Sequence, residues 1–382
     1  MRRDVTGKYV VSNVAEESVQ AFVPNPLPPV PPLDVSGQLM RKLDRAMQAL
    51  GELNGVVRNL TNPELFLYVY VRREAVLSSQ IEGTQSSLVD LLRHELKGQP
   101  GVPLADVRKV LSCVAAMNHG MSRIKGGFPF SLRLIREMHE ILLSHGKGEH
   151  LSPGEFRHSQ NWIGGTRPGN AMFVPPPPEH LMDCMGKLEL FLHDEKVMVT
   201  PLVKAALAHV QFETIHPFPD GNGRIGRLLI PLMLWSEKVL YQPLLYISLY
   251  FKKDRAQYYE KLGNVRVRGD WEDWVAFFAD AVFETAMDGA LLIERISTLV
   301  TEHDEMIGGL GRMVHSVRKV HGALQHRPMV TIAAVCERTG LVPNTVSACL
   351  ARLMQLGIVH EVTGGMRSRI FAYGPLLDLI SD

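Results

Sequence analysis

The sequence has little cysteine, and no two cysteines have the spacing of a zinc ribbon. Its 382 residues include four cysteines, Cys113, Cys184, Cys336 and Cys349, which lie far apart in the chain. This number and spacing argue against a disulfide-stapled scaffold and a cysteine zinc site. They fit a reducing environment, so we expect a cytoplasmic protein.

Net charge and long apolar runs are also lacking. The chain has 41 Lys+Arg against 40 Asp+Glu, a balance of +1, which excludes a protein that binds nucleic acid or membranes over its whole surface. The N-terminus has no apolar run typical of a signal peptide, and the most apolar stretch, residues 228–235, is too short to span a bilayer. We expect no membrane partner, and any nucleic-acid surface must be local.

Apolar residues are present in quantity, at 46% of the composition, and the length suggests two or three folded domains. They recur at helical spacing over residues 39–50, and Ser131 and Thr200-Pro201 are N-cap signals for two further helices. The pattern therefore predicts a mainly α fold.

Two segments interrupt the helical pattern. Residues 24–34 hold six prolines, which forbids a helix and predicts an extended polyproline II linker. Residues 154–178 are rich in Gly, Pro and Asn and predict a long loop, which its aromatic residues indicate is ordered and functional. Within that loop, residues 171–174 could form one arm of a short hairpin.

The C-terminal tail has a pattern of its own. Residues 331–339 and 343–356 predict two helices joined at Gly340, and residues 358–373 predict a hairpin, so the tail resembles a winged helix. Residues 312–382 carry eight Lys/Arg and four Asp/Glu, a local balance of +4 that DNA could use. Such modules also serve only to pack or dimerise, so DNA contact stays open here.

The most informative segment is residues 216–227, which read His-Pro-Phe-Pro-Asp-Gly-Asn-Gly-Arg-Ile-Gly-Arg between two apolar helical patterns. Gly221 and Gly223 let the backbone come close to a ligand at the start of the second helix. Free N–H groups and the positive end of the helix dipole favour an anion such as phosphate there. Arg224 and Arg227, three residues apart, can clamp several phosphate oxygens.

The same segment carries three more candidate groups. Asp220 is a hard oxygen ligand suited to a Mg²⁺ ion that bridges phosphates. Asn222 either holds the loop or donates to a phosphate oxygen. His216 has a pKa range suited to removing a proton from a hydroxyl near neutral pH. Each residue type is common in purely structural roles, and it is their combination that indicates chemistry.

These twelve residues match, position for position, the Fic family motif His-x-Phe-x-Asp-Gly-Asn-Gly-Arg-x-x-Arg, so the chain resembles that family. The resemblance implies an enzyme that moves AMP from ATP onto a Tyr, Thr or Ser hydroxyl of a target protein and releases pyrophosphate. It implies His216 as the general base and Asp220 as the Mg²⁺ ligand. The ATP-binding residues that it implies within the motif are Gly221, Asn222, Gly223, Arg224, Ile225, Gly226 and Arg227.

Two further resemblances lie outside the motif. Ala171, Met172, Phe173 and Val174 resemble the family's flap, which docks the target by strand-like pairing. Residues 160–164 also fit the family. Tyr258 and Tyr259 resemble part of an adenine pocket, although a tyrosine pair on a helix is often simply core.

An inhibitory segment is the last resemblance. Ser78, Glu82 and Gly83 fit the family's inhibitory pattern Ser/Thr-x-x-x-Glu-Gly/Asn, placed ahead of the catalytic domain. A carboxylate of Glu82 that reached Arg227 would occupy the donors needed by the ATP γ-phosphate. The resemblance therefore implies an autoinhibited enzyme.

The predicted fold is a Fic-type helical bundle with a small β-hairpin flap and a C-terminal winged helix-turn-helix. The expected parts are residues 1–109 with the Pro-rich segment and inhibitory helix, a catalytic domain over 110–285, a connecting helix over 286–311 and a winged helix over 312–382.

Two alternative functions remain at this stage. One is a DNA-binding regulator that only senses ATP at the Fic site, and the other is a Fic enzyme that transfers a different group or removes AMP. The target protein, self-modification, a homodimer and the signal that relieves inhibition stay open.

Overall fold

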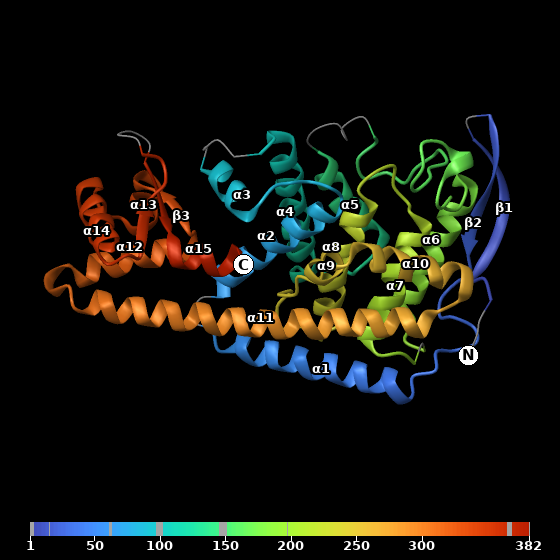
Figure 1. The fold of residues 1–382 in the computed structure, drawn as a ribbon, viewed down its shortest axis with the longest axis horizontal. Helices are drawn as coiled ribbons and strands as arrows, with labels where there is room; N and C mark the ends of the chain where they lie inside the picture. The colour runs from blue at the N-terminus through green and yellow to red at the C-terminus, as the bar shows by residue number, and fades with distance from the viewer. Residues whose placement is uncertain are drawn as a thin grey trace.

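The computed structural model describes residues 4–14, 16–60, 63–96, 102–144, 151–196, 198–364 and 369–381. The fold is mainly helical, as the sequence predicted (Figure 1). The strands are β1 (Gly7–Val14), β2 (Glu17–Pro24), β3 (Met329–Thr331), β4 (Val359–Glu361) and β5 (Ile370–Tyr373). The helices are α1 (Gly37–Arg58), α2 (Pro63–Ile81), α3 (Leu88–Glu95), α4 (Leu104–Lys125), α5 (Leu132–Leu143), α6 (Pro178–His193), α7 (Pro201–Ile215), α8 (Asn222–Ser236), α9 (Ser248–Lys253), α10 (Arg255–Arg268), α11 (Trp271–Gly308), α12 (Val314–His326), α13 (Ile332–Thr339), α14 (Pro343–Gln355) and α15 (Gly374–Ser381).

The centre of the molecule is built on helix α7. Its residues from Leu202 to Ile215 are buried except for Lys204, as expected for a mostly apolar helix that is packed on every side. The Thr200 hydroxyl accepts a hydrogen bond from the Val203 N–H at 3.4 Å, which confirms the predicted N-cap. Helix α7 packs against α8, α6 and α11, so the segment that joins α7 to α8 is held by the core at both ends.

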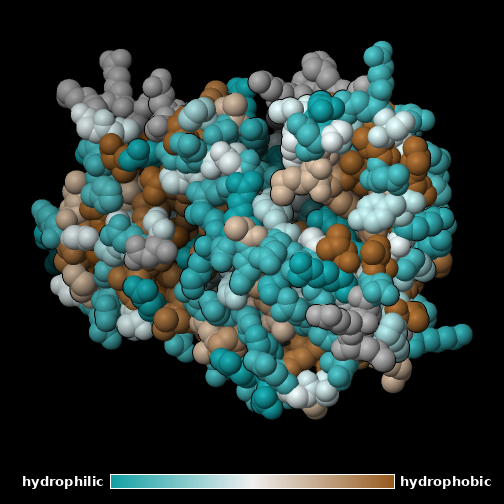
Figure 2. Space-filling model, turned by 45° about the vertical axis from the view of Figure 1, so that its right-hand side comes forward, coloured by the Kyte–Doolittle hydropathy of each residue, from teal (hydrophilic) through white to brown (hydrophobic). Residues whose placement is uncertain are grey.

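Helix α11 has 38 residues and runs beside α1 along one side of the molecule (Figure 1). It passes through residue 285 without a break and leads directly to the C-terminal region. None of the helices in the described part of the chain combines the length and the apolar character needed to cross a bilayer. The face drawn in Figure 2 is largely hydrophilic, with hydrophobic patches between the polar residues.

An N-terminal hairpin was not predicted from the sequence. Strands β1 and β2 pair antiparallel from Gly7 with Pro24 to Val14 with Glu17. The hairpin lies at the opposite end of the molecule from the C-terminal region (Figure 1). Its inner face forms a small cluster with the loop before α6, through Val174, Trp162 and Ala171. The hairpin therefore braces that loop.

The Pro-rich segment is non-helical, as predicted, but it is not a continuous polyproline II helix. The peptide bonds Leu27–Pro28 and Val30–Pro31 are cis, whereas polyproline II consists of trans peptides. That part of the prediction was wrong, because the composition of a Pro-rich run does not fix the isomer of each bond.

The C-terminal region confirms the winged helix. Strands β3, β5 and β4 form an antiparallel sheet in that order beside α12, α13 and α14. Thr331 caps α13, and Gly340 closes that helix at φ +70°. Residues 365–368 of the predicted hairpin lie outside the described residues.

Candidate active site

The segment between α7 and α8 presents His216. This residue ends α7 in the left-handed conformation, at φ 50° and ψ 61°, so the chain turns sharply away from the helix axis. Burial, together with the charge of Arg157, lowers the pKa of the His216 imidazole to about 4. The ring is therefore neutral near pH 7 and can accept a proton.

Asn222 holds the loop together. Its Oδ1 accepts a hydrogen bond from the Phe218 N–H at 2.8 Å, and its Nδ2 donates to the Phe218 carbonyl at 2.7 Å. The side chain is buried, so both ends of the amide are occupied. Of the two roles considered from the sequence, the structure supports the first.

His139 is a positioning residue that the sequence did not reveal. Its Nδ1 accepts from the Gly154 N–H at 3.0 Å, so the proton lies on Nε2, which donates to the Asp220 carbonyl at 2.9 Å. Its ring stacks on Phe218 with centroids 3.7 Å apart, and burial lowers its pKa to about 4. The only signal in the sequence was a histidine on an apolar helix face, which is common in cores.

The start of α8 carries the two arginines. Both are buried, and Arg224 Nε has no hydrogen-bond partner among the described residues, while Arg224 Nη2 lies 3.4 Å from Asp220 Oδ2. A side chain at Gly223 would meet Glu82, since an added Cβ would lie 2.4 Å from Glu82 Oε1. The glycine and the arginines form an electropositive helix start, suited to an anion.

Ser78 and Glu82 bind Arg227. Arg227 donates from Nε to Ser78 Oγ at 2.9 Å, and from Nη2 to the Ser78 carbonyl at 3.0 Å and to Glu82 Oε1 at 2.7 Å. Burial would raise the pKa of Glu82, but the Arg227 guanidinium outweighs it and the pKa is lowered. Gly83 follows in a left-handed turn at φ +95°. The end of α2 therefore lies directly on the proposed anion site.

The remaining motif positions face the interior. Ile225 is fully buried in the core, and the Gly226 carbonyl accepts from His209 Nδ1 at 3.0 Å. Behind Gly226 lies Glu213, whose Oε1 is buried without a partner among the described residues. Burial raises the pKa of Glu213 to about 7.

The two tyrosines lie in different surroundings. Tyr258 is fully buried, donates to His209 Nε2 at 2.8 Å and stacks on Phe251 at 4.5 Å. Tyr259 is 37% exposed and lies 5.1 Å from the Tyr258 ring. Tyr259 alone of the pair has a substantial face free to stack on a base.

The proposed flap is held from both sides. Phe173 forms an isolated antiparallel bridge with Ile163, and the Val174 carbonyl accepts from the Phe22 N–H of β2 at 2.9 Å. Just before these two residues in the chain, Met172 is 85% exposed and Ala171 is partly buried. The segment is extended and presents a side chain outward.

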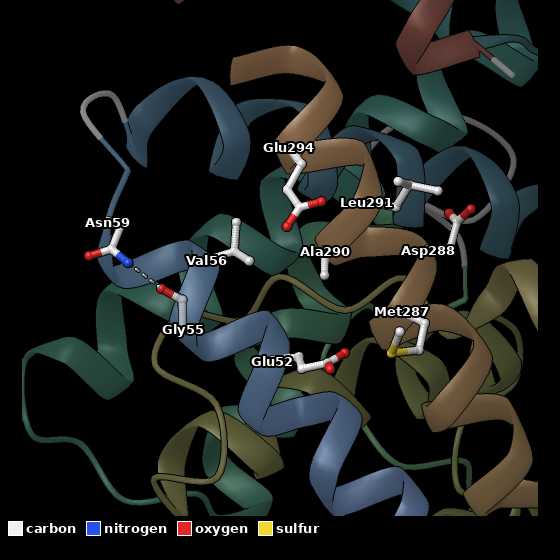
Figure 3. A pocket seen from close by; sticks show the side chains of 9 residues that line it. All are labelled: Glu52, Gly55, Val56, Asn59, Met287, Asp288, Ala290, Leu291 and Glu294. Atoms are coloured by element: carbon white, nitrogen blue, oxygen red, sulfur yellow. Dashed lines mark hydrogen bonds between the residues drawn. The ribbon is translucent and has the colours of Figure 1, made fainter. Parts of the chain in front are cut away.

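A cavity of about 730 Å³ lies elsewhere, between α1 and α11 (Figure 3). Its lining includes the carboxylates of Glu52, Asp288 and Glu294 together with the apolar Leu291 and Met287. Since such a lining repels phosphate, a nucleotide fits the start of α8 and not this cavity.

Asp220 is the residue that fits a metal. Its carboxylate is 56% exposed, and Oδ1 accepts from the Gly221 N–H at 2.6 Å. The described residues contain no group of three or more His, Cys, Asp or Glu that could hold a metal ion. This arrangement fits Mg²⁺, which proteins often bind through one or two carboxylates together with substrate phosphates.

Three protein-family models match the chain. Residues 40–122 match the Fic/DOC family N-terminal model, residues 129–234 match the Fic/DOC family model, and residues 315–360 match a winged helix-turn-helix DNA-binding model.

The chain is also similar to individual proteins. It is 28% identical over 294 residues to a protein adenylyltransferase Fic of Culex quinquefasciatus, covering 75% of this chain and 54% of that protein. It is 31% identical over 246 residues to a protein adenylyltransferase Fic of Drosophila grimshawi, covering 63% of this chain and 46% of that protein. The chain thus spans about half the length of these relatives.

A solved structure extends the likeness of fold. The crystal structure of a Fic family protein from Desulfovibrio desulfuricans G20 superposes with a TM-score of 0.58 at 17% identity and covers 90% of this chain and 98% of that one. At this identity the likeness concerns the fold alone.

Proposed function

Because the chain contains a Fic domain preceded by a Fic/DOC N-terminal region and followed by a winged helix-turn-helix, we propose that it is a protein adenylyltransferase. The observation that carries the proposal is a neutral imidazole at His216, next in the chain to an electropositive helix start with two buried arginines. This pairs a base with an anion site, as the transfer of a nucleotidyl group requires. The names of the relatives support the same activity.

The reaction uses the residues as follows. His216 takes the proton of a Tyr, Thr or Ser hydroxyl on the target protein, and the oxygen attacks the α-phosphorus of ATP. A new oxygen–phosphorus bond forms, the bond from the α-phosphorus to the bridging oxygen breaks, and pyrophosphate leaves with the electron pair. Arg224 and Arg227 bind the β- and γ-phosphates, and the N–H groups at the start of α8 stabilise the developing charge.

Mg²⁺, held by Asp220 and the phosphates, would neutralise charge on the leaving group. The extended segment 171–174 docks the target by backbone pairing, and the exposed face of Tyr259 stacks on adenine. The four free cysteines support a cytoplasmic location.

Glu82 keeps this site inactive. Its carboxylate binds the same Arg227 guanidinium that the γ-phosphate needs, and it lies directly over Gly223. Because Glu82 displaces the γ-phosphate from Arg227, ATP would bind with its α-phosphorus out of line with the attacking hydroxyl of the target. Release of the end of α2 would therefore be required for turnover.

Labelled ATP tests the proposed transfer. The Glu82→Gly variant is incubated with a cell lysate and with ATP labelled either at the α- or at the γ-phosphate. We expect protein-bound label only from the α-labelled ATP, and none when His216→Ala is added to the same variant. Label from γ-labelled ATP would instead show phosphate transfer, and label that survives His216→Ala would contradict the assigned base.

DNA binding by the winged helix is a second proposed function. The observation that favours it is the outer face of α14, which exposes Asn344, Ser347 and Arg352. Asn344 and Ser347 lie in the first half of this helix and Arg352 in its last turn. Polar residues near the start of a recognition helix are typical of contacts with the major groove, and a basic residue farther along can bind the phosphate backbone.

Anisotropy of a fluorescent DNA duplex tests this binding. We expect the affinity to fall with salt, and Arg352→Ala to reduce the slope of log affinity against log salt by about 1. Arg133→Ala, which removes another exposed cation, from α5, should leave the slope unchanged. Loss of DNA binding with unaltered AMP transfer is the expected pattern, and no measurable binding by the intact chain at low salt would overturn the proposal.

A further inference from the structure

Arg157, on the loop between α5 and α6, is a buried cation that donates hydrogen bonds from all three guanidinium nitrogens. Its side chain is 3% exposed. Nε donates to the His216 carbonyl at 3.0 Å, Nη1 donates to the Ser159 carbonyl at 3.2 Å, and Nη2 donates to the carbonyls of Pro176 and Ile215. All the acceptors are main-chain oxygens, and two of them belong to the end of α7.

No ion pair of Arg157 with a carboxylate is found among the described residues. Burial lowers the pKa of its guanidinium to about 10, so it still carries its charge near neutral pH. Burying a cation without a counter-ion costs free energy that a neutral side chain would avoid. Neither the family motif nor the bonding of Glu82 to Arg227 accounts for a charge at this place.

The geometry shows what the guanidinium does for His216. The last carbonyls of a helix have no partner inside the helix, and here the Arg157 fork binds those of Ile215 and His216. The backbone of His216 is in the left-handed region, which is unfavourable for a residue with a Cβ and persists only where its surroundings hold it. The main-chain N–H of Arg157 also donates to the carbonyl of Pro217, the residue that follows His216, at 2.9 Å.

We propose that Arg157 is a positioning residue for the general base, holding the main chain at His216 so that the imidazole faces the reacting hydroxyl. Its charge also acts on the ring, because a nearby cation disfavours the imidazolium. Glu82, just beyond the end of α2, and Arg266 of α10 are the other charged side chains that act on this imidazole, and a hydrogen bond with the backbone of Glu213 raises its pKa. This inference rests on the proposed transferase function.

Two substitutions separate geometry from charge. In the Glu82→Gly form, Arg157→Gln removes the charge and most of the carbonyl contacts, while Arg157→Lys keeps the charge with a shorter reach. Arg136→Gln is the matched control, since Arg136 donates to the Gly154 carbonyl of the same loop at 2.7 Å, away from His216. Rates are measured across ATP concentration and pH, and folding is checked by circular dichroism.

We expect Arg157→Gln to lower kcat by about 100-fold with the KM for ATP changed less than about threefold, since misplacing a catalytic group by about 1 Å has an effect of this size. The acid limb of the pH profile should move to higher pH in Arg157→Gln and stay in place in Arg157→Lys. The Arg157→Lys variant should also recover part of the kcat lost in Arg157→Gln. Arg136→Gln should behave like its parent.

Several results would overturn the inference. The first is an unchanged kcat in Arg157→Gln. The second is an equal loss of kcat in Arg157→Gln and Arg157→Lys with the acid limb of the pH profile unmoved, which would indicate a purely structural role. If Arg157→Gln does not fold, the Arg157→Lys variant provides the test. The inference then requires that its kcat is lower than that of the Glu82→Gly parent while its KM for ATP is unchanged.

The pKa of His216, measured by NMR with labelled histidine, needs no transferase activity. We expect it near 4 in the parent and higher in Arg157→Gln. If this shift appears while the Glu82→Gly form transfers no AMP, the proposed function fails, while the action of the Arg157 charge on the His216 imidazole stands.

Discussion

At the residue scale, burial sets the protonation of several side chains. Burial lowers the pKa of four histidines from 6.5 to about 4 or below, so they are neutral in the folded protein at pH 7: His139, His209, His216 and His321. Burial acts in the opposite sense on two carboxyl groups, raising the pKa of Glu74 to about 8 and that of Glu213 to about 7. The histidines and the two carboxyl groups therefore make the free energy of unfolding depend on pH.

The free energy of unfolding should peak near pH 6.5. Below that value the unfolded histidines bind protons that the folded ones do not, so stability falls as the pH drops from 6.5 toward 4. Above it the folded Glu74 and Glu213 keep protons that the unfolded ones have lost, so stability falls as the pH rises toward 8. Urea unfolding from pH 4.5 to 8.5 measures this curve.

Glu74→Gln identifies the source of the alkaline fall. The amide keeps a hydrogen-bonding group against Ser248, whose N–H lies 3.2 Å from the Glu74 carboxylate, but it cannot ionise. The fall above pH 6.5 should be shallower in this variant. An identical curve would contradict the assignment.

Asn222 should be a stability determinant as well as a motif residue. Asn222→Ala leaves the N–H and the carbonyl of Phe218 buried without their partners, which should lower the free energy of unfolding by about 2 kcal/mol or more. Urea unfolding checks this, with Asn59→Ala as a control because the Asn59 side chain donates an exposed hydrogen bond to the Gly55 carbonyl. An equal free energy of unfolding in the two variants would contradict the claim that Asn222 holds the loop together.

The residue scale also shows what the sequence could reveal of the site. His216 and Arg227 belong to one short segment whose chemistry follows from residue types at fixed spacing. Arg157 and His139 could not be found this way, because their partners are backbone groups that only the folded chain brings to them. Tyr258 resembled an adenine-pocket residue, and its bond to buried His209 emerges only from the packing of α7 against α10.

At the element scale, the end of α2 carries the two residues that bind Arg227. Ser78 lies in its last turn and Glu82 directly beyond it, so a single helix end delivers both groups that bind Arg227. The carboxyl group of Glu74, on the same helix, binds the Ser248 N–H and hydroxyl and anchors α2 to α9. Movement of this helix end would release Arg227.

Weakening that end should raise activity in part. Ser78→Ala removes the acceptor of Arg227 Nε but leaves Glu82 in place, so we expect AMP transfer to rise roughly threefold to tenfold. Ser79→Ala is the control, a neighbouring buried serine whose hydroxyl does not bind Arg227. Initial rates with α-labelled ATP check this, and equal rates for the two variants would show that the Ser78 hydroxyl does not contribute to inhibition.

Elements with strong periodicity or caps were predictable, and those without were not. Thr200 and Ser131 marked true helix starts, since a capping hydroxyl acts within one turn of chain. Strands β1 and β2 were missed because a two-stranded hairpin has little stability of its own and forms here against the loop that contains Val174.

At the scale of the whole molecule, the region that matches the Fic/DOC family and the winged-helix region are packed together. One cluster of buried apolar residues runs from Val23 to Ile380 across both. Tyr373 of β5 lies 2.6 Å from His303 Nδ1 of α11 and 3.2 Å from His321 Nε2 of α12. His326 at the end of α12 lies 3.3 Å from Glu64 at the start of α2, so the winged-helix region also contacts α2.

This continuity predicts a single unfolding transition. Calorimetry of the intact chain should give one peak with equal calorimetric and van't Hoff enthalpies. Tyr373→Phe, which leaves His303 and His321 without their shared hydroxyl, should lower the transition temperature and broaden or split the peak. Two separate peaks in the parent protein would show that the regions fold independently.

The central claim, that Glu82 inhibits an AMP transferase by occupying Arg227, is tested most directly by one ratio. Initial rates of AMP incorporation are compared between the unaltered chain and Glu82→Gly at the same ATP and Mg²⁺ concentrations. Since Glu82 Oε1 makes a charge-assisted bond of 2.7 Å to a buried guanidinium, we predict an increase of about tenfold or more. Equal rates for the two proteins would contradict the account.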